Sequence, residues 1–159
     1  MFTAINLKKL LTSLLFTLGM DLLGGFFTRN AAIDYAAWVK PPLAPPSYLF
    51  GIVWTILYIL MGIAFYRIRI NRNHPKDRQS AIILFILVMC FQLLWTVFFF
   101  TFNFKGFAAI WCGLLFVLTA LCTIVFSAVD KTAAKLMLPT LIWTGFALYL
   151  NIGIWLLNR

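Results

Sequence analysis

Aromatic residues recur at helical spacing in three apolar stretches, each with a small or polar companion. Residues three, four or seven positions apart lie on the same side of an α-helix. Rings arranged in this way can bind a flat apolar molecule by stacking. The residues concerned are Trp54 and Tyr58, then Gln92, Trp95 and Phe99, and finally Trp143, Ala147 and Asn151.

Helix packing is the other interpretation of these faces, and for an aromatic stripe it is the more common one. Met61 and Phe65 continue the stripe of Trp54 and Tyr58. In a membrane this interpretation is weaker, because the hydrophobic effect does not drive helices together there and small residues make the closer contacts. Gln92 fits both interpretations, as the partner of another helix or as a polar contact to a ligand.

Asp21 is the one acidic residue inside an apolar stretch. An ionisable group at membrane depth is costly, and this makes Asp21 a candidate for proton coupling. The alternative is that Asp21 lies close to the membrane surface and reaches water or a neighbouring donor. Both interpretations stay open.

Constellations of reactive residues are absent from the sequence. It contains no hydrolase triad and no pair of carboxylates. Cys90, Cys112 and Cys122 lack the close spacing of a metal or redox site. His74, the single histidine, lies in a basic loop. We therefore predict no metal site and no catalytic side chain of a familiar kind.

The composition places the apolar stretches in a membrane. Hydrophobic residues make up 64% of the 159 residues and charged residues only 11%, far from the balance of a soluble domain. Five stretches approach the roughly 20 residues that cross the hydrocarbon core. We predict one domain over 1–159, an all-α bundle of five transmembrane helices with a structured loop between the first two. The spans lie at about 10–27, 48–66, 80–101, 107–129 and 136–157, with Pro139 in the first turn of the last.

The net charge is +9. The basic residues are distributed as membrane topology predicts, and they do not form the basic surface typical of nucleic-acid binding. The positive-inside rule places the more basic side, which holds the N-terminus, in the cytoplasm. The C-terminus and the loop after the first span are then outside. The first span lacks a cleavage site, which favours the plasma membrane of a prokaryote. The cytoplasmic side holds Lys8, Lys9, Arg67, Arg69, Arg72, Lys76, Arg78, Lys131 and Lys135, against Arg29, Lys40, Lys105 and Arg159 outside.

The segment Lys40 to Pro46 contains two pairs of prolines. Proline fixes φ and lacks an amide proton, so this segment is neither helix interior nor central strand. We predict a rigid lid over the outer mouth of the bundle, which would lose little entropy when a ligand binds beneath it. Trp38 and Tyr48 flank the segment and are typical of the membrane interface.

Motifs in three stretches resemble the TspO/MBR family, the tryptophan-rich sensory proteins related to the mitochondrial translocator protein (peripheral benzodiazepine receptor). The first runs from Tyr35 to Ala64, with Lys40-Pro41 and Pro45-Pro46 followed by Trp54, Leu57-Tyr58 and Met61-Gly62. The second and third are Leu94-Trp95 with Phe99-Phe100, and Pro139, Leu141-Ile142-Trp143, Ala147 and Leu150-Asn151. Together they cover essentially the whole chain.

The resemblance implies a five-helix bundle whose first loop caps a pocket for porphyrins and, in relatives, for sterols and synthetic benzodiazepine-site ligands. Three positions depart from the family pattern: Leu43 where Trp is common, Trp38 where Leu is common and Gln92 where Asn is common. No counterpart of the C-terminal cholesterol motif follows Tyr149, which argues against sterol binding. The pocket residues implied are Tyr35, Pro45, Trp54, Tyr58, Gln92, Trp95, Trp143 and Ala147, and helical spacing adds Phe99 and Asn151.

The function that the resemblance implies is binding of a tetrapyrrole such as protoporphyrin IX by a membrane sensor, regulator or carrier in a stress response. Lys40 could reach the carboxylates of such a ligand. Two alternatives stay open: light- and oxygen-dependent degradation of bound porphyrin at Trp54 and Trp143, and a small proton-coupled exporter that uses Asp21. The expected partners are the porphyrin, the lipid bilayer and a second copy of the chain, with no nucleic acid and no required cofactor.

Overall fold

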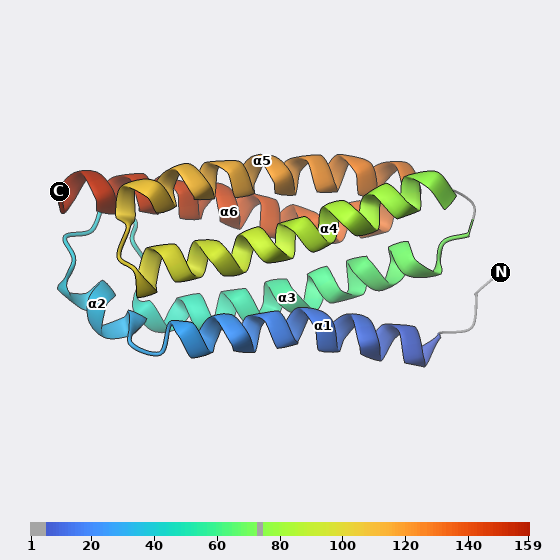
Figure 1. The fold of residues 1–159 in the computed structure, drawn as a ribbon, viewed down its shortest axis with the longest axis horizontal. Helices are drawn as coiled ribbons and strands as arrows, with labels where there is room; N and C mark the ends of the chain where they lie inside the picture. The colour runs from blue at the N-terminus through green and yellow to red at the C-terminus, as the bar shows by residue number, and fades with distance from the viewer. Residues whose placement is uncertain (1–5, 73–74) are drawn as a thin grey trace.

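The computed structural model describes residues 6–72 and 75–159, and in this part of the chain all secondary structure is helical. Five long helices lie side by side, and the short helix α2 lies at one end of the bundle (Figure 1). Each long helix is sufficiently long and apolar to cross a membrane. The predicted all-α membrane bundle is therefore confirmed. His74, which the sequence places in a basic loop, lies outside the described residues. The helices are α1 (Leu7–Phe27), α2 (Ala31–Ala37), α3 (Ser47–Ile70), α4 (Pro75–Thr96), α5 (Lys105–Val129) and α6 (Lys131–Leu157).

The last helix begins earlier than predicted, so Pro139 lies inside it and not in its first turn. The cause is Asp130, whose side chain accepts a hydrogen bond of 2.9 Å from the amide of Ala133. An acidic residue at this position satisfies a backbone donor that the helix itself leaves without a partner. The prediction about Pro139 was wrong because it took the apolar run as the start of the helix.

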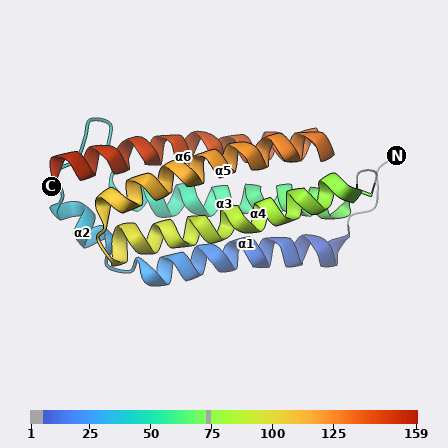
Figure 2. The same cartoon turned by 45° about the horizontal axis from the view of Figure 1, so that its top comes forward.

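The order of helices across the bundle leaves α1 at one side. α1 packs mainly against α3, α5 packs against α4 and α6, and α3 also contacts α6. Figure 2 shows α1 and α6 on opposite sides, with α3 and α4 between them. α1 is thus less enclosed by neighbours than the other helices.

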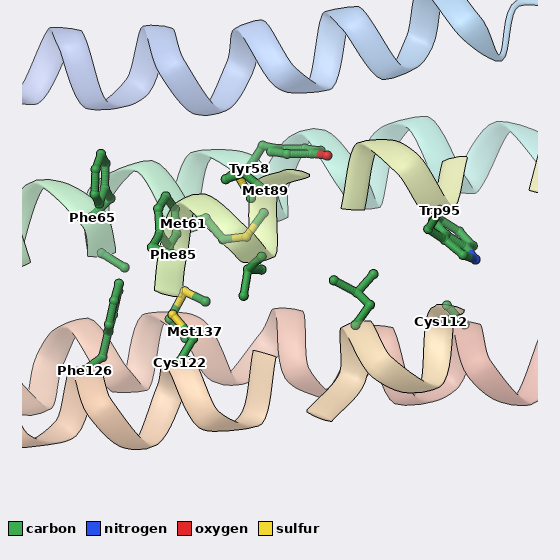
Figure 3. Packing of buried hydrophobic residues seen from close by; sticks show 14 of the residues in the cluster. Tyr58, Met61, Phe65, Phe85, Met89, Trp95, Cys112, Cys122, Phe126 and Met137 are labelled. Carbon is green, nitrogen blue, oxygen red and sulfur yellow. The ribbon is translucent and has the colours of Figure 1, made fainter. Parts of the chain in front are cut away.

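The half of the bundle remote from α2 has a filled core. The rings of Phe65 and Phe85 stack with centroids 4.5 Å apart, and Phe85 stacks on Phe126 at 5.7 Å. Figure 3 shows these three rings crossing the interior from α3 through α4 to α5. Phe85 and Phe126 are fully buried. This half of the interior is therefore closely packed.

An ion pair joins the helices at the end opposite α2. Arg67 Nη2 lies 2.9 Å from Asp130 Oδ2, and Arg67 Nε donates a hydrogen bond of 3.2 Å to Asp130 Oδ1. Burial alone would raise the pKa of the Asp130 carboxyl. Hydrogen bonds from Arg67 and the Ala133 amide, together with the charge of Arg67, outweigh burial and hold this pKa below its ordinary value. The carboxylate form is therefore the one that stabilises the fold.

Replacing Asp130 with alanine should lower the free energy of unfolding by about 1–2 kcal/mol. Most of this loss comes from the helix cap, since the Arg67 side chain is 38% exposed and solvent screens its ion pair. A group with a lowered folded-state pKa stabilises above its unfolded pKa of about 4, and this contribution disappears as the pH falls through the folded value. Thermal unfolding in detergent, at neutral pH and in steps below about pH 4, measures both effects.

Asp130→Asn is the matched control, because asparagine keeps the cap and removes the charge. It should keep most of the stability at neutral pH and lose the part of the acid dependence that comes from this site. Equal unfolding temperatures of the wild type and Asp130→Ala at neutral pH would contradict the assigned role.

Candidate ligand-binding site

A cavity of about 240 Å³ lies near the α2 end, between α1, α2, α3 and α4. α3 and α4 supply most of its aromatic side chains, whereas α1 and α2 supply mainly small residues. Its lining consists of Asp21, Gly24, Gly25 and Thr28 of α1, Ala31, Ala32 and Tyr35 of α2, Ser47, Phe50, Gly51, Trp54 and Tyr58 of α3, and Gln92, Trp95, Thr96 and Phe100 of α4 and its continuation.

The α3 wall is a single helix stripe. Ser47, Gly51, Trp54 and Tyr58 follow one another at steps of four, three and four residues, which keeps them on one face. Gly51 lies within this stripe, and a methyl group at its Cβ position would meet no atom within 4 Å. The missing side chain therefore leaves space between two aromatic residues and the start of the helix.

The α1 wall is built in the same way but was not predicted. Asp21, Gly24 and Gly25 share one face of α1, and Thr28, the residue that follows the helix, continues this wall. Asp21 accepts a hydrogen bond of 3.1 Å from the hydroxyl of Thr55, so Thr55 is its neighbouring donor. The spacing of the glycines relative to Asp21 was the available signal for this wall.

The aromatic wall is held together by contacts between tilted rings. The ring of Trp54 lies 6.1 Å from those of Tyr58 and Trp95, measured between centroids. Figure 3 shows Tyr58 and Trp95 further along the bundle than the phenylalanine core. Gln92 adds a polar group: it is 1% exposed, and its Oε1 has no hydrogen-bond partner among the described residues. The wall can therefore stack on a ligand and offer it a hydrogen bond.

Asn151 and Ala147, predicted as ligand contacts, lie behind Trp95 and do not line the cavity. The side-chain oxygen of Asn151 accepts a hydrogen bond of 3.3 Å from the Trp95 indole, and its amide donates to the Ala147 carbonyl at 3.0 Å. Both residues thus orient Trp95. Phe99 likewise lies behind Trp95: the two rings stack, with their centroids 5.9 Å apart.

Trp143 also supports the aromatic wall from outside the cavity. Its ring meets that of Trp54 edge-on at 6.4 Å and that of Phe50 at 6.1 Å. Both Trp54 and Phe50 line the cavity, whereas Trp143 does not. A ligand in the cavity would therefore contact Trp54 directly and Trp143 only through it.

A π-helical turn, η1 (Val97–Thr101), follows α4 and changes which phenylalanine faces the cavity. The amide of Phe102 donates to the carbonyl of Val97 at 3.0 Å, five residues back. This wider turn is frequent at functional sites. Phe100 lines the cavity, while Phe99 lies against Trp95.

Trp38 packs against the same turn, and its predicted place at the membrane interface stays a prediction. Its ring lies 5.2 Å from Phe99 and stacks on Phe100 at 6.1 Å. Tyr48 is exposed, as an interfacial residue would be. Leu43, with a φ of 66°, is 83% exposed. Of these loop residues, Trp38 thus packs against the bundle, whereas the side chain of Leu43 points away from it.

The roof of the cavity is α2 and not the proline segment. Tyr35 of α2 lines the cavity, and its hydroxyl donates a hydrogen bond of 2.9 Å to the carbonyl of Pro45. Burial raises the pKa of the Tyr35 hydroxyl, which keeps it protonated as a donor. Pro45 thus acts through its backbone oxygen on Tyr35 and does not line the cavity.

The proline segment is attached to α6. Tyr149 donates to the carbonyl of Pro42 at 2.8 Å, and the side chain of Asn158 bonds both the amide and the carbonyl of Val39 at 2.9 and 2.8 Å. Lys40 is occupied as well, because its ammonium group donates to the carbonyls of Tyr35 and Trp38 at 2.9 and 2.8 Å. Lys40 is therefore a cap for α2 and not a free cation for a ligand carboxylate.

Comparison with known proteins agrees with this architecture. The TspO/MBR family model matches residues 11–156. The chain is 32% identical to the tryptophan-rich protein TspO of Chlorobaculum tepidum and 35% identical to that of Archaeoglobus fulgidus, each over 96% of this chain and 99% of the relative. It is 30% identical to the translocator protein of Bos taurus, over 91% of this chain and 88% of that protein. The chain therefore belongs to the TspO/MBR family.

Proposed function

We propose that this protein binds a tetrapyrrole such as protoporphyrin IX in the cavity below α2 and serves as a membrane sensor or carrier for it. The observation that carries the proposal is the wall of Trp54, Tyr58 and Trp95 on one side of an open space. Indole and phenol rings stack on flat apolar molecules. The glycines of the opposite wall leave room for the ligand to lie flat against these rings.

The size of the cavity requires α2 to move when a macrocycle binds. Its volume of about 240 Å³ is below the roughly 300–1,000 Å³ of pockets that enclose drug-sized ligands. α2 has only 7 residues and connects to α1 through a short turn. Breaking the bond from Tyr35 to Pro45 would release it from the proline segment. We therefore expect α2 to swing away from the cavity, while the proline segment stays on α6.

Arg29 is the cation best placed for the carboxylates of such a ligand. It lines a second cavity of about 200 Å³, which shares Thr28, Ala31 and Phe100 with the first. No lysine or arginine is among the described residues that line the first cavity. A tetrapyrrole with its rings on Trp54 would thus direct its carboxylates past Phe100 toward Arg29.

Titration with protoporphyrin IX should quench the tryptophan fluorescence of the purified protein in a saturable manner. Arg29→Gln should weaken binding of the diacid by about three- to tenfold, because it removes a charge-assisted hydrogen bond at a partly exposed site. The dimethyl ester of protoporphyrin is the control ligand, since it lacks the carboxylates and should bind both forms alike. Quenching that rises without saturation in the wild type would refute the proposed function.

The other activities considered from the sequence stay predictions. Trp54 could react with an illuminated pigment in the cavity, with Trp143 in contact behind it. Asp21 lines the cavity, as a proton-coupled exporter would need. The placement of the α2 end outside the cell and the formation of a homodimer are also predictions.

A further inference from the structure

The cavity is negatively polarised in a chain with an excess of positive charge. The protein has 13 Lys and Arg residues and 4 Asp and Glu residues. Asp21 is nevertheless the one formally charged residue among the described residues of the lining. The hydroxyl of Thr55 is the donor that the described residues supply to its carboxylate. A carboxylate can accept about four hydrogen bonds, so Asp21 has acceptor capacity left for a ligand.

A second acceptor belongs to the same cavity. Gln92 lines it, is only 1% exposed, and leaves Oε1 without a hydrogen-bond partner in the described part of the chain. A buried polar atom of this kind costs free energy until a donor reaches it. Gln92 and Asp21 therefore both favour a ligand that donates hydrogen bonds.

The aromatic wall favours the same class of ligand. The faces of Trp54, Tyr58 and Trp95 carry negative charge density, and cations bind over such faces within about 6 Å of the ring centroid. Aromatic rings together with a carboxylate are the surroundings in which proteins hold organic ammonium groups. The lining provides both, and none of its described residues is a lysine or arginine that would neutralise Asp21.

We propose that Asp21, Gln92 and the rings of Trp54, Tyr58 and Trp95 form a subsite for a positively charged nitrogen. The cavity then selects flat apolar molecules that carry an ammonium group at the Asp21 side. This inference rests on the proposed function in one respect, namely that the cavity binds aromatic molecules. It adds a charge preference that the tetrapyrrole proposal alone does not contain.

Three pyrene derivatives of nearly equal shape test the charge preference: 1-pyrenemethylamine, 1-pyrenemethanol and 1-pyreneacetate. Energy transfer from tryptophan to pyrene reports their binding to the protein in an uncharged detergent, and the alcohol corrects for partition into micelles. The wild type should bind the amine about tenfold more tightly than the alcohol, and the acetate most weakly. Asp21→Asn should bring the affinities for amine and alcohol to within about twofold of each other.

Asp34→Asn is the matched control. It removes the same charge at the same end of the bundle, but Asp34 does not line the first cavity. This variant should keep the preference for the amine. If Asp21→Asn loses affinity for the alcohol too, Asp21→Glu replaces it, because glutamate keeps the charge and should keep the preference.

The outcomes separate this inference from the proposed function. Equal affinity of the wild type for amine and alcohol, or a preference that survives Asp21→Asn, overturns the ammonium subsite while the aromatic cavity stands. An Asp21→Glu variant that binds the alcohol but does not prefer the amine also overturns the ammonium subsite and leaves the aromatic cavity standing. Absence of saturable binding by all three pyrenes overturns both the subsite and the cavity as a binding site.

Discussion

Replacing Gly51 with leucine should weaken binding of protoporphyrin at the cavity by more than about tenfold, which corresponds to at least ~1.4 kcal/mol, without unfolding the protein. Gly51 lies on the α3 stripe between Ser47 and Trp54, so a side chain at this position projects toward the ligand. No atom lies within 4 Å of the place that a Cβ would take here, so the Cβ of a leucine meets no steric barrier. The leucine would occupy space in front of Trp54 that a flat ring system needs, and movement of α2 would not clear it, because both residues lie on α3.

Gly19→Leu separates cavity filling from the general effect of a leucine in a transmembrane helix. Gly19 is exposed on α1, has no atom within 4 Å of its Cβ position, and does not line the cavity. This variant should bind the ligand as the wild type does. Tryptophan quenching gives the affinities, and thermal unfolding in detergent should show both variants folded. Unchanged affinity in Gly51→Leu would place the ligand elsewhere.

The sequence predicted the residues of the aromatic wall that lie on regular helix. Trp54 and Tyr58 are four residues apart, and the distance in the chain alone places them on one face. The sequence did not reveal which residues line the cavity and which lie behind the lining residues. Asn151 is polar and lies on the face of Trp143, yet it bonds the indole of Trp95 from behind. Residue spacing shows which residues share a face of one helix. Whether that face lines a cavity depends on how the neighbouring helices pack against it.

Apart from Tyr35, which was predicted, the α1 and α2 side of the cavity was missed because most of its residues carry little side-chain information. Gly24, Gly25, Ala31 and Ala32 contribute by being small, and sequence patterns count such residues as helix contacts. Asp21 was recognised as unusual, but its place in the cavity depends on how α1 packs against α3. The turn η1 was missed for another reason, since nothing in the run of phenylalanines signals a π-helix.

The proline segment was correctly identified as irregular, but its position was predicted incorrectly. Prolines leave their carbonyl oxygens free of regular secondary structure, and hydroxyl donors occupy them here: Tyr35 bonds Pro45, and Tyr149 bonds Pro42. Pro41 also packs closely on Gly153, where an added Cβ would come within 2.6 Å of the proline ring. The segment is therefore attached to α6, and α2 is the element that covers the cavity.

A close contact between helices that affects the site lies between α1 and α3 at Gly62. A Cβ at Gly62 would lie 2.6 Å from the hydroxyl oxygen of Thr17, 2.8 Å from a methyl group of Leu14 and 3.3 Å from the Leu14 Cα. Side chains can rotate, but the backbone at Leu14 can give way only if α1 moves. Small residues at such positions allow the close approach on which helix association in membranes depends.

Gly62→Ala should therefore lower the free energy of unfolding by about 1–2 kcal/mol, because the overpacking cost of roughly 1–3 kcal/mol exceeds the gain of up to about 1 kcal/mol in helix propensity. It should also weaken ligand binding, since movement of α1 carries Asp21 and Gly25 away from the aromatic wall. Thermal unfolding in detergent and quenching titrations measure the two effects. Gly19→Ala is the matched control: its Cβ meets nothing within 4 Å, so only the propensity gain remains. If Gly62→Ala is as stable as Gly19→Ala, then α1 and α3 are not in close contact at Gly62, and α1 does not form a fixed wall of the cavity.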